Sequence, residues 1–539
     1  MPRLTIDNRE VEVPPWATIL AAAQKLGINI PTLCYLEGCP PSTSCLVCTV
    51  KVLGNCRLVP SCGTAAADGM QVESETAEIH QVRRSALELL LSDHLGDCLA
   101  PCQFACPAGM DIPRMLRQIA SEDLRGAIVT VKHDIALPAV LGRICPAPCE
   151  KACRRRPADG AVSICLLKRF VADADMASSA RYLPDCQPPS GRRVAIVGAG
   201  PAGWSAAYYL LQQGHACTIF DENPQPGGRL RREIAAQELP PDVLDADLQP
   251  VVRLGAELRM NARIGGKEAF EELRNQFDAI LIACGASAKQ QAEAWGLETA
   301  ARGVHVTQDT YETSLAGVFA AGNAVRGKGL VIRSAADGKE VAVSIDQHLS
   351  GRKVTGPQKS FSTRIGRLEE DELALYLAGA SQSPRQDPAA APRGYPHAGF
   401  APQEAVEQSA RCMHCDCRGL QTCKLRHYSD LYGADPRRYK DTRKPFRQDR
   451  QHAQVIYEPG KCIQCGLCIE IAAQAGEPVG LTFIGRGFDV RVGVPLDGSL
   501  REALQKTAAQ CVAACPTAAL CWAKDTSASH TSSRLIHGQ

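Results

Sequence analysis

The sequence has no marked excess of either charge: 60 Lys and Arg residues are balanced by 58 Asp and Glu residues, for a formal net charge of +2. No basic footprint for nucleic acid is present, so no nucleic-acid partner is expected. No run of about 18 apolar residues occurs, so no membrane span is expected. The start, MPRLTIDNREVEV, alternates apolar and polar residues and lacks the apolar core of an export signal.

Cysteine, in contrast, is abundant, with 26 residues that mostly fall in tight groups. So many thiols without an export signal indicate a reducing cytoplasm, where grouped cysteines bind metal. Thiolates two or three residues apart converge on one metal centre, which makes a disulfide scaffold the weaker interpretation. We therefore predict a cytoplasmic protein with several iron–sulfur clusters.

The pattern along the chain predicts a multidomain α/β protein. LTIDNREVEV has the alternation of a hairpin, ATILAAAQKLGI is an amphipathic helix, and MLRQIASEDLRGAIVTVK is also expected to be helical. The predicted parts are a [2Fe-2S] domain at 1–75, a helical [4Fe-4S] domain at 76–185, a Rossmann-like domain at 192–350, a linker at 351–405, a ferredoxin-like [4Fe-4S] module at 406–523 and a disordered tail at 524–539.

The first cysteine group has spacings of ten, two and thirteen residues, wider than in plant-type ferredoxins. With CYLEGC upstream and SCGTAAADGMQV downstream, it resembles the ferredoxin-like start of the large iron–sulfur subunit of complex I and of iron-only hydrogenases. This resemblance implies a [2Fe-2S] cluster on a β-grasp fold. Zinc is the alternative, although zinc sites usually use two compact pairs. The ligands would be Cys34, Cys45, Cys48 and Cys62.

The next two groups lie in LLSDHLGDCLAPCQFACPAGMDIP and GRICPAPCEKACRRR. They resemble the helical N-terminal domain shared by the glutamate synthase small subunit, dihydropyrimidine dehydrogenase and the ferredoxin:NADP transhydrogenases. In that family the two halves interleave to hold two [4Fe-4S] clusters. The resemblance implies one cluster on Cys98, Cys102 and Cys153 and another on Cys106, Cys145 and Cys149.

Each of these clusters needs a fourth ligand. His94 stands where the family has a cysteine, and SDHLGDC also resembles complex I, in which a histidine ligates a [4Fe-4S] cluster; a helix-terminal surface histidine is the alternative. For the other cluster the family supplies Glu or Gln, but the matching residue here is Lys168, a cation that cannot ligate iron. Cys165 lies one turn earlier on the same helix face, so we hypothesise that it is the ligand, with a buried free thiol as the alternative.

The last groups lie near the C-terminus. KCIQCGLCIE with AACPTAAL resembles bacterial ferredoxin, but Ala472 and Ala508 stand where a second cluster would need cysteines, and Cys511 is left without a role. One cluster is therefore expected, on Cys462, Cys465, Cys468 and Cys515. RCMHCDCRGLQTC is compact with unusual spacing and predicts a further [4Fe-4S] cluster, or alternatively zinc, on Cys412, Cys415, Cys417 and Cys423.

Between the cysteine groups, VAIVGAGPAGW has a strand before it and a helix and second strand after it. Gly198 makes the turn, Gly200 lets the backbone approach a diphosphate, and Gly203 permits close helix packing. The diphosphate is expected at the helix N-terminus, where unpaired N–H groups favour anions. Asp221 ends the second strand, placed for ribose hydroxyls. This pattern alone does not separate FAD from NAD.

Three further pieces, PQPGGRL, AILIACGA and GVFAAGNAV, resemble the glutamate synthase family and favour FAD. In the last piece Asn323 replaces an Asp that bonds the flavin's ribityl chain in the family. It keeps an acceptor oxygen and loses the charge. The predicted cofactor-binding residues are Gly198, Gly200, Pro201, Ala202, Gly203, Asp221, Glu222, Gly228, Arg229, Leu230, Gly285, Gly322 and Asn323.

The family's second nucleotide domain has no counterpart in this sequence. Relatives insert an NADPH-binding domain between the segments that correspond to AILIACGA and GVFAAGNAV. Only about thirty residues separate Gly285 from Gly317 here, too few for a βαβαβ nucleotide-binding domain. No second glycine fingerprint occurs. We therefore expect the flavin to exchange electrons with iron–sulfur clusters, or with a nucleotide bound by another subunit.

The expected function is that of an electron-transfer subunit of a cytoplasmic redox complex. It would be an oxidoreductase with FAD, one [2Fe-2S] and three to four [4Fe-4S] clusters, and no acid–base catalytic residue. Expected partners are an NAD(P)H-oxidising flavoprotein, a molybdenum or tungsten oxidoreductase or a hydrogenase, and ferredoxin. The alternatives are a self-sufficient NAD(P)H-dependent flavin reductase and an assembly platform with a vestigial flavin.

Overall fold

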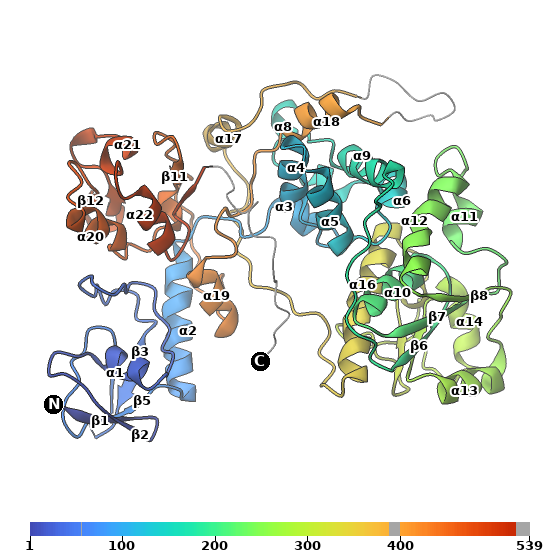
Figure 1. The fold of residues 1–539 in the computed structure, drawn as a ribbon, viewed down its shortest axis with the longest axis horizontal. Coiled ribbons are helices and arrows are strands. Elements are labelled where there is room, and N and C mark those ends of the chain that lie inside the picture. Colours follow the sequence, from blue (N-terminus) through green and yellow to red (C-terminus); the bar gives the residue numbers. More distant parts are fainter. Residues whose placement is uncertain (55, 388–398, 524–539) are drawn as a thin grey trace. The chain divides into compact units, whose positions relative to one another are not determined.

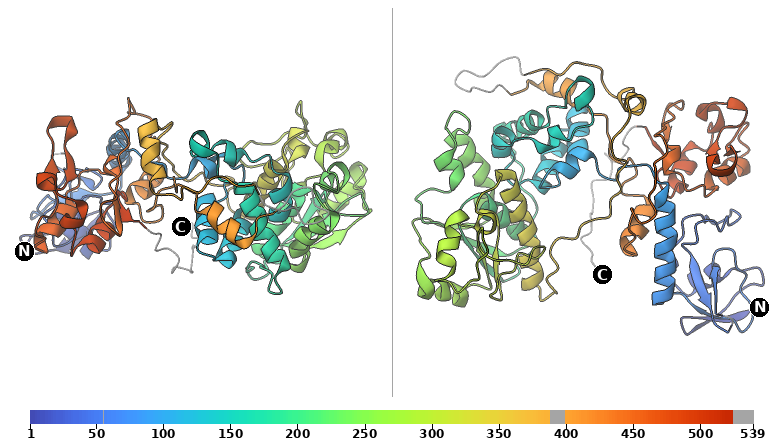
Figure 2. Two further views of the ribbon diagram at one scale, coloured as in Figure 1. Left: turned by 90° about the horizontal axis from the view of Figure 1, so that it is seen from above. Right: turned by 180° about the vertical axis from the view of Figure 1, so that it is seen from behind.

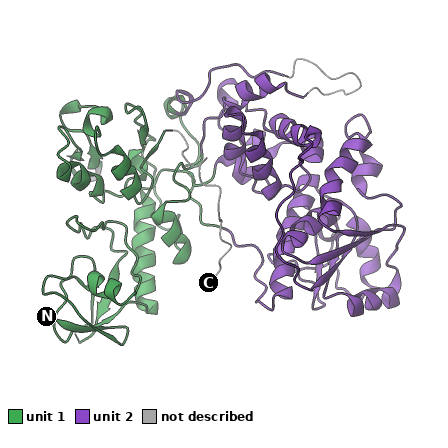
Figure 3. Ribbon diagram, viewed as in Figure 1, with its two compact units in different colours: residues 1–99, 360–375, 416–539 green, residues 100–359, 376–415 purple. Residues whose placement is uncertain are grey.

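A computed structural model describes residues 1–54, 56–387 and 399–523. The predicted tail at 524–539 lies outside the described residues, as does part of the linker. The chain divides into two compact units (Figure 3). Unit 1 comprises residues 1–99, 360–375 and 416–539, and unit 2 comprises residues 100–359 and 376–415.

Unit 1 begins with a five-stranded sheet in the order β2-β1-β5-β3-β4, in which β1 pairs antiparallel with β2 and parallel with β5 (Figure 1). Asp7 and Asn8, both at positive φ, form the hairpin turn, as two-residue hairpins require. The Thr18 hydroxyl caps the following helix. The predicted hairpin, helix and β-grasp arrangement are thus confirmed. The elements are β1 Arg3–Ile6, β2 Arg9–Glu12, α1 Ile19–Lys25, β3 Thr49–Val52, β4 Arg57–Pro60 and β5 Gln71–Glu73.

The rest of unit 1 contains one long helix and a small C-terminal part. There β11 pairs antiparallel with β14, β12 pairs with β13, and α20 packs against α22. Its elements are α2 Ala77–Ser92, α19 Lys424–Leu431, β11 Val455–Tyr457, α20 Leu467–Gln474, β12 Thr482–Ile484, β13 Arg491–Gly493, α21 Leu500–Ala503, α22 Ala508–Ala514 and β14 Leu520–Trp522, with short 3₁₀ turns at Pro459–Lys461, Gly487–Asp489 and Pro495–Asp497. Helix α17, Glu370–Leu377, spans the boundary between the units.

Unit 2 opens with short helices. The segment 115–132, predicted as helical throughout, forms two helices, because Glu122 adopts a positive φ and the Asp123 carboxylate caps the second helix by accepting from the Gly126 N–H at 2.8 Å. The helices are α3 Pro101–Ala105, α4 Ile112–Ala120, α5 Leu124–Asp134, α6 Pro138–Ile144, α7 Pro148–Lys151, α8 Arg156–Asp159, α9 Ile164–Ala177 and, much later in the chain, α18 Pro402–Ser409.

The second half of unit 2 is a parallel sheet in the order β10-β9-β6-β7-β8. Apolar side chains of α10 and α16 pack on one face, while Phe270 and Trp295 belong to the core on the other. Figure 2 shows the green helices of this part around its sheet. The elements are β6 Arg193–Val197, α10 Pro201–Gln212, β7 Ala216–Phe220, α11 Arg229–Glu233, α12 Pro241–Arg253, β8 Glu257–Arg259, α13 Gly266–Gln276, β9 Ala279–Ile282, η1 Gly285–Ser287, α14 Ala288–Ala292, β10 Val318–Ala320, α15 Asn323–Arg326 and α16 Val331–Leu349.

The unit boundaries differ from the predicted domain boundaries in two places. The boundary predicted after residue 75 separates α2 from the β-grasp sheet, yet both belong to unit 1. Their connection is the fully buried Arg83, whose guanidinium donates to the carbonyl oxygens of Thr49 at 3.2 Å and Ser74 at 2.9 Å. The module predicted at 406–523 is divided between Cys415 and Asp416.

All 26 cysteines lie in the described residues and none forms a disulfide. Over the described ranges, no helix combines the length and the apolar surface needed to cross a bilayer.

Unit 2 contains a buried ion pair that we expect to stabilise it. The Lys132 ammonium donates to Asp175 at 2.8 Å, and both side chains are at most 4% exposed. The change Asp175→Asn leaves a buried charge without its partner, so we expect a loss of about 3 kcal/mol in the free energy of unfolding. Chemical denaturation measures it. The matched control is Asp309→Asn in the exposed pair with Lys359, which should change stability little; equal losses in both variants would contradict the prediction.

Candidate iron–sulfur and nucleotide sites

The first cysteine group forms two close pairs. The Cys34 and Cys45 sulfurs lie 3.3 Å apart and those of Cys48 and Cys62 lie 3.4 Å apart, and all four residues are buried. A [2Fe-2S] cluster has two irons, each bound by two cysteine thiolates, so this arrangement fits that cluster. The β-grasp sheet supplies two of the four residues at the ends of β3 and β4.

The C-terminal group lines one small pocket in unit 1, formed by Cys462, Cys465, Cys468 and Cys515 together with Tyr457 and Gly466. Backbone N–H groups donate to two of these sulfurs, from Gln464 to Cys462 and from Leu520 to Cys515, both at 3.4 Å. Such N–H···S bonds are typical of iron–sulfur ligands. Cys511 does not line the pocket; it is fully buried in the adjacent apolar core.

Also in unit 1, Cys98 lies near Cys417 and Cys423, and His94 precedes Cys98 by four residues. The Cys417 N–H donates to the Cys98 carbonyl at 3.2 Å, and Cys423 precedes α19, where its sulfur accepts from the Arg426 N–H at 3.4 Å. The buried Nδ1 of His94 has no hydrogen-bond partner. Burial, with Lys461 nearby, lowers the pKa of His94 to about 3. The ring is therefore neutral at pH 7, the form that binds metal.

In unit 2, Cys165 lies within hydrogen-bonding reach of Cys145 and Cys149. It is held there at the start of α9 by its own N–H, which donates to the Glu150 carboxylate at 2.9 Å. Cys106 belongs to the same apolar cluster. The structure thus brings together the four cysteines expected for this site.

Of the four other predicted ligands in unit 2, three belong to that apolar cluster, namely Cys102, Cys153 and Cys412. The fourth, Cys415, follows Cys412 by three residues in the same unit. The Arg155 guanidinium donates to the Arg411 carbonyl at 2.5 Å, which fixes the residue before Cys412 beside the segment after Cys153. His414, on the same loop, lies 3.4 Å from the Arg117 guanidinium on α4.

The loop CMHC has the same turn as the ferredoxin-like loop CIQC. In both, the residue before the second cysteine has a positive φ, 50° at His414 and 54° at Gln464. In both, the N–H of that residue donates to the first cysteine's sulfur at 3.4 Å. This shared geometry fits an iron–sulfur ligand loop at Cys412 and Cys415.

The boundary between the two units falls within two of the groups predicted from the sequence. Cys412 and Cys415 lie in unit 2 whereas Cys417 and Cys423 lie in unit 1, and Cys98 and His94 are separated in the same way from Cys102 and Cys153. Among the described residues, no three His, Cys, Asp or Glu side chains surround a point closely enough for one metal ion. A [4Fe-4S] cluster, in contrast, binds its four ligands through four different irons.

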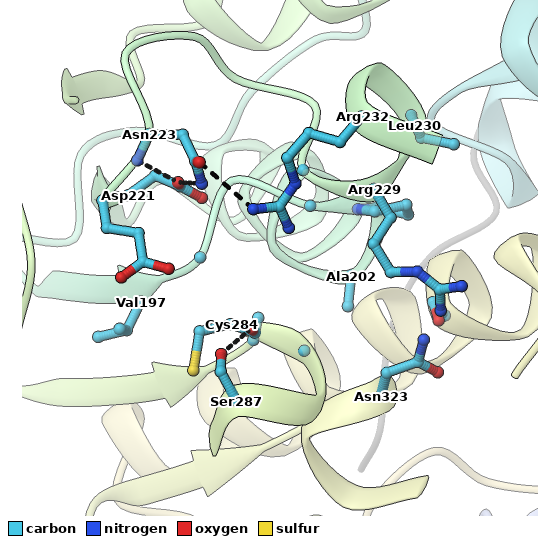
Figure 4. A pocket seen from close by; sticks show the side chains of 18 of the residues that line it. Val197, Ala202, Asp221, Asn223, Arg229, Leu230, Arg232, Cys284, Ser287 and Asn323 are labelled. Atoms are coloured by element: carbon cyan, nitrogen blue, oxygen red, sulfur yellow. Dashed lines mark hydrogen bonds between the residues drawn. The ribbon is translucent and has the colours of Figure 1, made fainter. Parts of the chain in front are cut away.

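The glycine fingerprint opens on a pocket of about 1080 Å³, including the part open to solvent. Figure 4 shows Asp221, Asn223 and Arg232 together on one side and Cys284 and Ser287 across from them. All three additional sequence pieces reach this pocket. The predicted residues that line it are Gly198, Gly200, Pro201, Ala202, Asp221, Glu222, Gly228, Arg229, Leu230, Gly285 and Asn323.

The two other predicted residues, Gly203 and Gly322, pack behind the pocket. A Cβ on Gly203 would lie 2.1 Å from the Gly198 carbonyl oxygen, so only glycine allows α10 to approach the strand. Gly200, in contrast, has open space beside its Cα, as expected where a diphosphate approaches.

The Asp221 carboxylate accepts from the Ala199 N–H at 2.7 Å and from Asn223, so it also orders the glycine turn. The pocket further contains Arg232, Cys284, Ser287 and Ser334, which sequence reasoning missed. Arg232 lies one turn after Arg229 on α11, a helical spacing that a search for a second cation near a diphosphate could have used.

The comparisons with known proteins match this inventory. Residues 2–77 match the family described as 2Fe-2S iron-sulfur cluster binding domain, and residues 93–180 match dihydropyrimidine dehydrogenase domain II, 4Fe-4S cluster. Residues 196–250 match the NAD(P)-binding Rossmann-like domain. Two segments of the chain therefore match iron–sulfur domain families, and a third matches a Rossmann-like family. The predicted fold class and both cluster types are thereby confirmed.

The matching relatives are subunits of redox enzymes. The NADPH-Fe(3+) oxidoreductase subunit beta of Geobacter sulfurreducens is 37% identical over 35% of the chain and 28% of the relative. The NAD-dependent dihydropyrimidine dehydrogenase subunit PreT of Salmonella typhimurium is 37% identical over 35% and 46%, and the NADP(+)-dependent formate dehydrogenase subunit beta of Moorella thermoacetica is 36% identical over 36% and 30%. The chain thus spans less than half of each relative's length.

We expect Gly198→Ala to abolish binding of the nucleotide cofactor. Gly198 has a φ of 117°, and a Cβ there would lie 2.5 Å from the Ala283 carbonyl carbon and oxygen, so the turn must shift. Cofactor released by denaturation, measured by absorbance, checks the loss. Gly265→Ala is the control, because nothing lies within 4 Å of its Cβ position and its φ is negative. Full cofactor content in Gly198→Ala would contradict the prediction.

Proposed function

We propose that the chain is an electron-transfer subunit of a cytoplasmic redox complex and that its pocket binds FAD. When bound, FAD supplies a conversion between two-electron and one-electron transfer. The observation that best supports this proposal is a contact in unit 2. Val331 lines the nucleotide pocket and also packs against the apolar cluster that contains the unit 2 cysteines. A bound flavin and the clusters would therefore share one continuous core.

The pocket's side chains support a flavin dinucleotide. Arg229 and Arg232 place two cations beside the glycine turn, where a diphosphate is expected. Asn323 begins α15 in the pocket and offers an acceptor oxygen to the ribityl chain. Between Gly285 and Gly317, all of which is described, the chain forms η1, α14 and isolated bridges, with no βαβ unit. This absence of a second nucleotide-binding unit in the segment supports electron exchange between the flavin and the clusters, and not between the flavin and a second nucleotide bound to this chain.

We further propose five cluster sites, three in unit 1 and two in unit 2. Unit 1 would hold a [2Fe-2S] cluster and two [4Fe-4S] clusters, and unit 2 two [4Fe-4S] clusters. In this proposal the site expected from the sequence on Cys412, Cys415, Cys417 and Cys423, for [4Fe-4S] or zinc, is divided between two clusters. The ligand sets are Cys34, Cys45, Cys48 and Cys62; Cys462, Cys465, Cys468 and Cys515; His94, Cys98, Cys417 and Cys423; Cys106, Cys145, Cys149 and Cys165; and Cys102, Cys153, Cys412 and Cys415.

The unit 1 sites are connected by one apolar cluster. Cys34 and Cys45 of the first set, Cys423 of the histidine-containing set and Cys465 of the ferredoxin-like set all belong to it. Leu425 also donates its N–H to the Pro516 carbonyl, next to Cys515. Such packing supports electron transfer among the three sites.

The division of the ligands predicts how two substitutions combine. Cys412→Ser and Cys417→Ser should each remove the iron of one [4Fe-4S] cluster, and the double variant should remove the iron of two, because the residues serve different sites. Iron content per chain and low-temperature electron paramagnetic resonance measure the outcome. Cys521→Ser, in a buried thiol outside every set, is the control. A double variant that loses no more iron than either single variant would restore the single-site interpretation.

The partners are proposed from the relatives. The names of these relatives describe subunits of enzymes that act with NADPH, Fe(3+), formate or dihydropyrimidines. We propose that this chain likewise joins a larger assembly. Its partners would be an NAD(P)H-oxidising subunit, a molybdenum, tungsten or hydrogenase-type enzyme, and ferredoxin. The second candidate function, a self-sufficient NAD(P)H-dependent reductase, is favoured only by the Rossmann-like family description.

Anaerobic mixing separates the two functions. Neither NADH nor NADPH should bleach the flavin of the isolated chain within seconds, whereas dithionite should reduce both flavin and clusters. Stopped-flow absorbance at flavin wavelengths follows the reaction. Rapid bleaching by either nucleotide would favour the self-sufficient reductase, and a preparation that binds no flavin would overturn the FAD assignment.

A further inference from the structure

One lysine is buried among the cysteines of unit 2. Lys168 lies on α9, one turn after Cys165, and is only 3% exposed. Its Nζ lies 4.0 Å from the Cys165 sulfur. Because helix residues three apart share a face, the ammonium points to the side on which Cys165 meets Cys145 and Cys149.

No carboxylate compensates this cation. Over the described ranges, no Asp or Glu oxygen forms an ion pair with Lys168. Glu150, the carboxylate that contacts Cys165, is already engaged by the Cys165 N–H at 2.9 Å and by Arg385 at 3.4 Å. The other buried lysines differ: Lys132 pairs with Asp175 and Lys461 pairs with Glu458.

An unpaired buried ammonium is costly, because it loses its hydration without gaining a counter-charge. Neutral thiols would not offset this cost. Thiolates that ligate an iron–sulfur cluster would, since the ligated cluster has a net negative charge.

We propose that Lys168 is a fixed positive charge that raises the reduction potential of the [4Fe-4S] cluster on Cys106, Cys145, Cys149 and Cys165. The inference rests on the ligand set proposed above. Reduction adds one negative charge to the cluster, and a cation held nearby in a low-dielectric interior stabilises the reduced state more than the oxidised state. Lys168 therefore acts through its charge and not as a ligand. It occupies the place of the Glu or Gln ligand implied by the family resemblance, while Cys165 takes over the ligation.

The test is a redox titration of the full chain, monitored by electron paramagnetic resonance, with the signal assigned as the one that Cys165→Ser removes. Lys168→Gln should lower the cluster's potential, so that the ratio of reduced to oxidised cluster at the wild-type midpoint falls about tenfold or more. Lys168→Arg keeps the charge, so its ratio of reduced to oxidised cluster at the wild-type midpoint should stay within about twofold of the wild-type ratio. Lys151→Gln is the matched control, because Lys151 is exposed on α7 two residues after Cys149.

Each outcome decides the proposal. An unshifted signal in Lys168→Gln overturns it. If Lys168→Gln loses the cluster while flavin content is retained, Lys168→Arg decides: a cluster kept in Lys168→Arg supports the charge, and a cluster lost there overturns it. If Cys165→Ser removes no signal, the proposed ligand set is wrong and this inference is wrong with it. If Cys165→Ser removes the signal but Lys168→Gln does not shift its potential, only this inference is overturned.

Discussion

The hydrogen bond from the Cys417 N–H to the Cys98 carbonyl fixes the organisation of unit 1. It joins residues that are more than three hundred positions apart, at the places where the chain leaves unit 1 and finally returns to it. It brings Cys98 close to Cys417 and Cys423. The proposed set of His94 with these three cysteines would also give the buried Nδ1 of His94 a partner, because a buried ring nitrogen without a hydrogen bond is costly unless a metal binds it.

The parts of the structure that depend on local sequence were predictable. The β-grasp hairpin follows from a two-residue period, and the nucleotide pocket follows from glycines whose positions tolerate no Cβ. The set of Cys462, Cys465, Cys468 and Cys515 also follows from spacing, since a single short turn places its first three members.

The position of the unit boundary was not predictable from cysteine spacing. Cys415 and Cys417 are two residues apart, yet the chain crosses from one compact unit to the other between them. Nothing in the letters RCMHCDCRGLQTC marks that crossing. The information lies in long-range contacts, such as the buried Arg155 that binds the Arg411 carbonyl. The same limit applies to Lys168: its identity excludes ligation, but only burial and the missing carboxylate show an unpaired charge.

The separation of the ligand pairs also bears on how the protein is made. Cys34 to Cys62 and Cys106 to Cys165 are synthesised as short stretches, so their sites are complete soon after they leave the ribosome. In the proposed ligand sets Cys98 and Cys102, in contrast, precede Cys417 and Cys412 by some 310 residues, which corresponds to roughly 15 to 60 s of synthesis at typical rates. During that interval these thiols lack the other members of their sets. Loading of iron at these two sites would therefore be among the last steps of biogenesis, and a chain truncated before residue 412 would retain only the early sites.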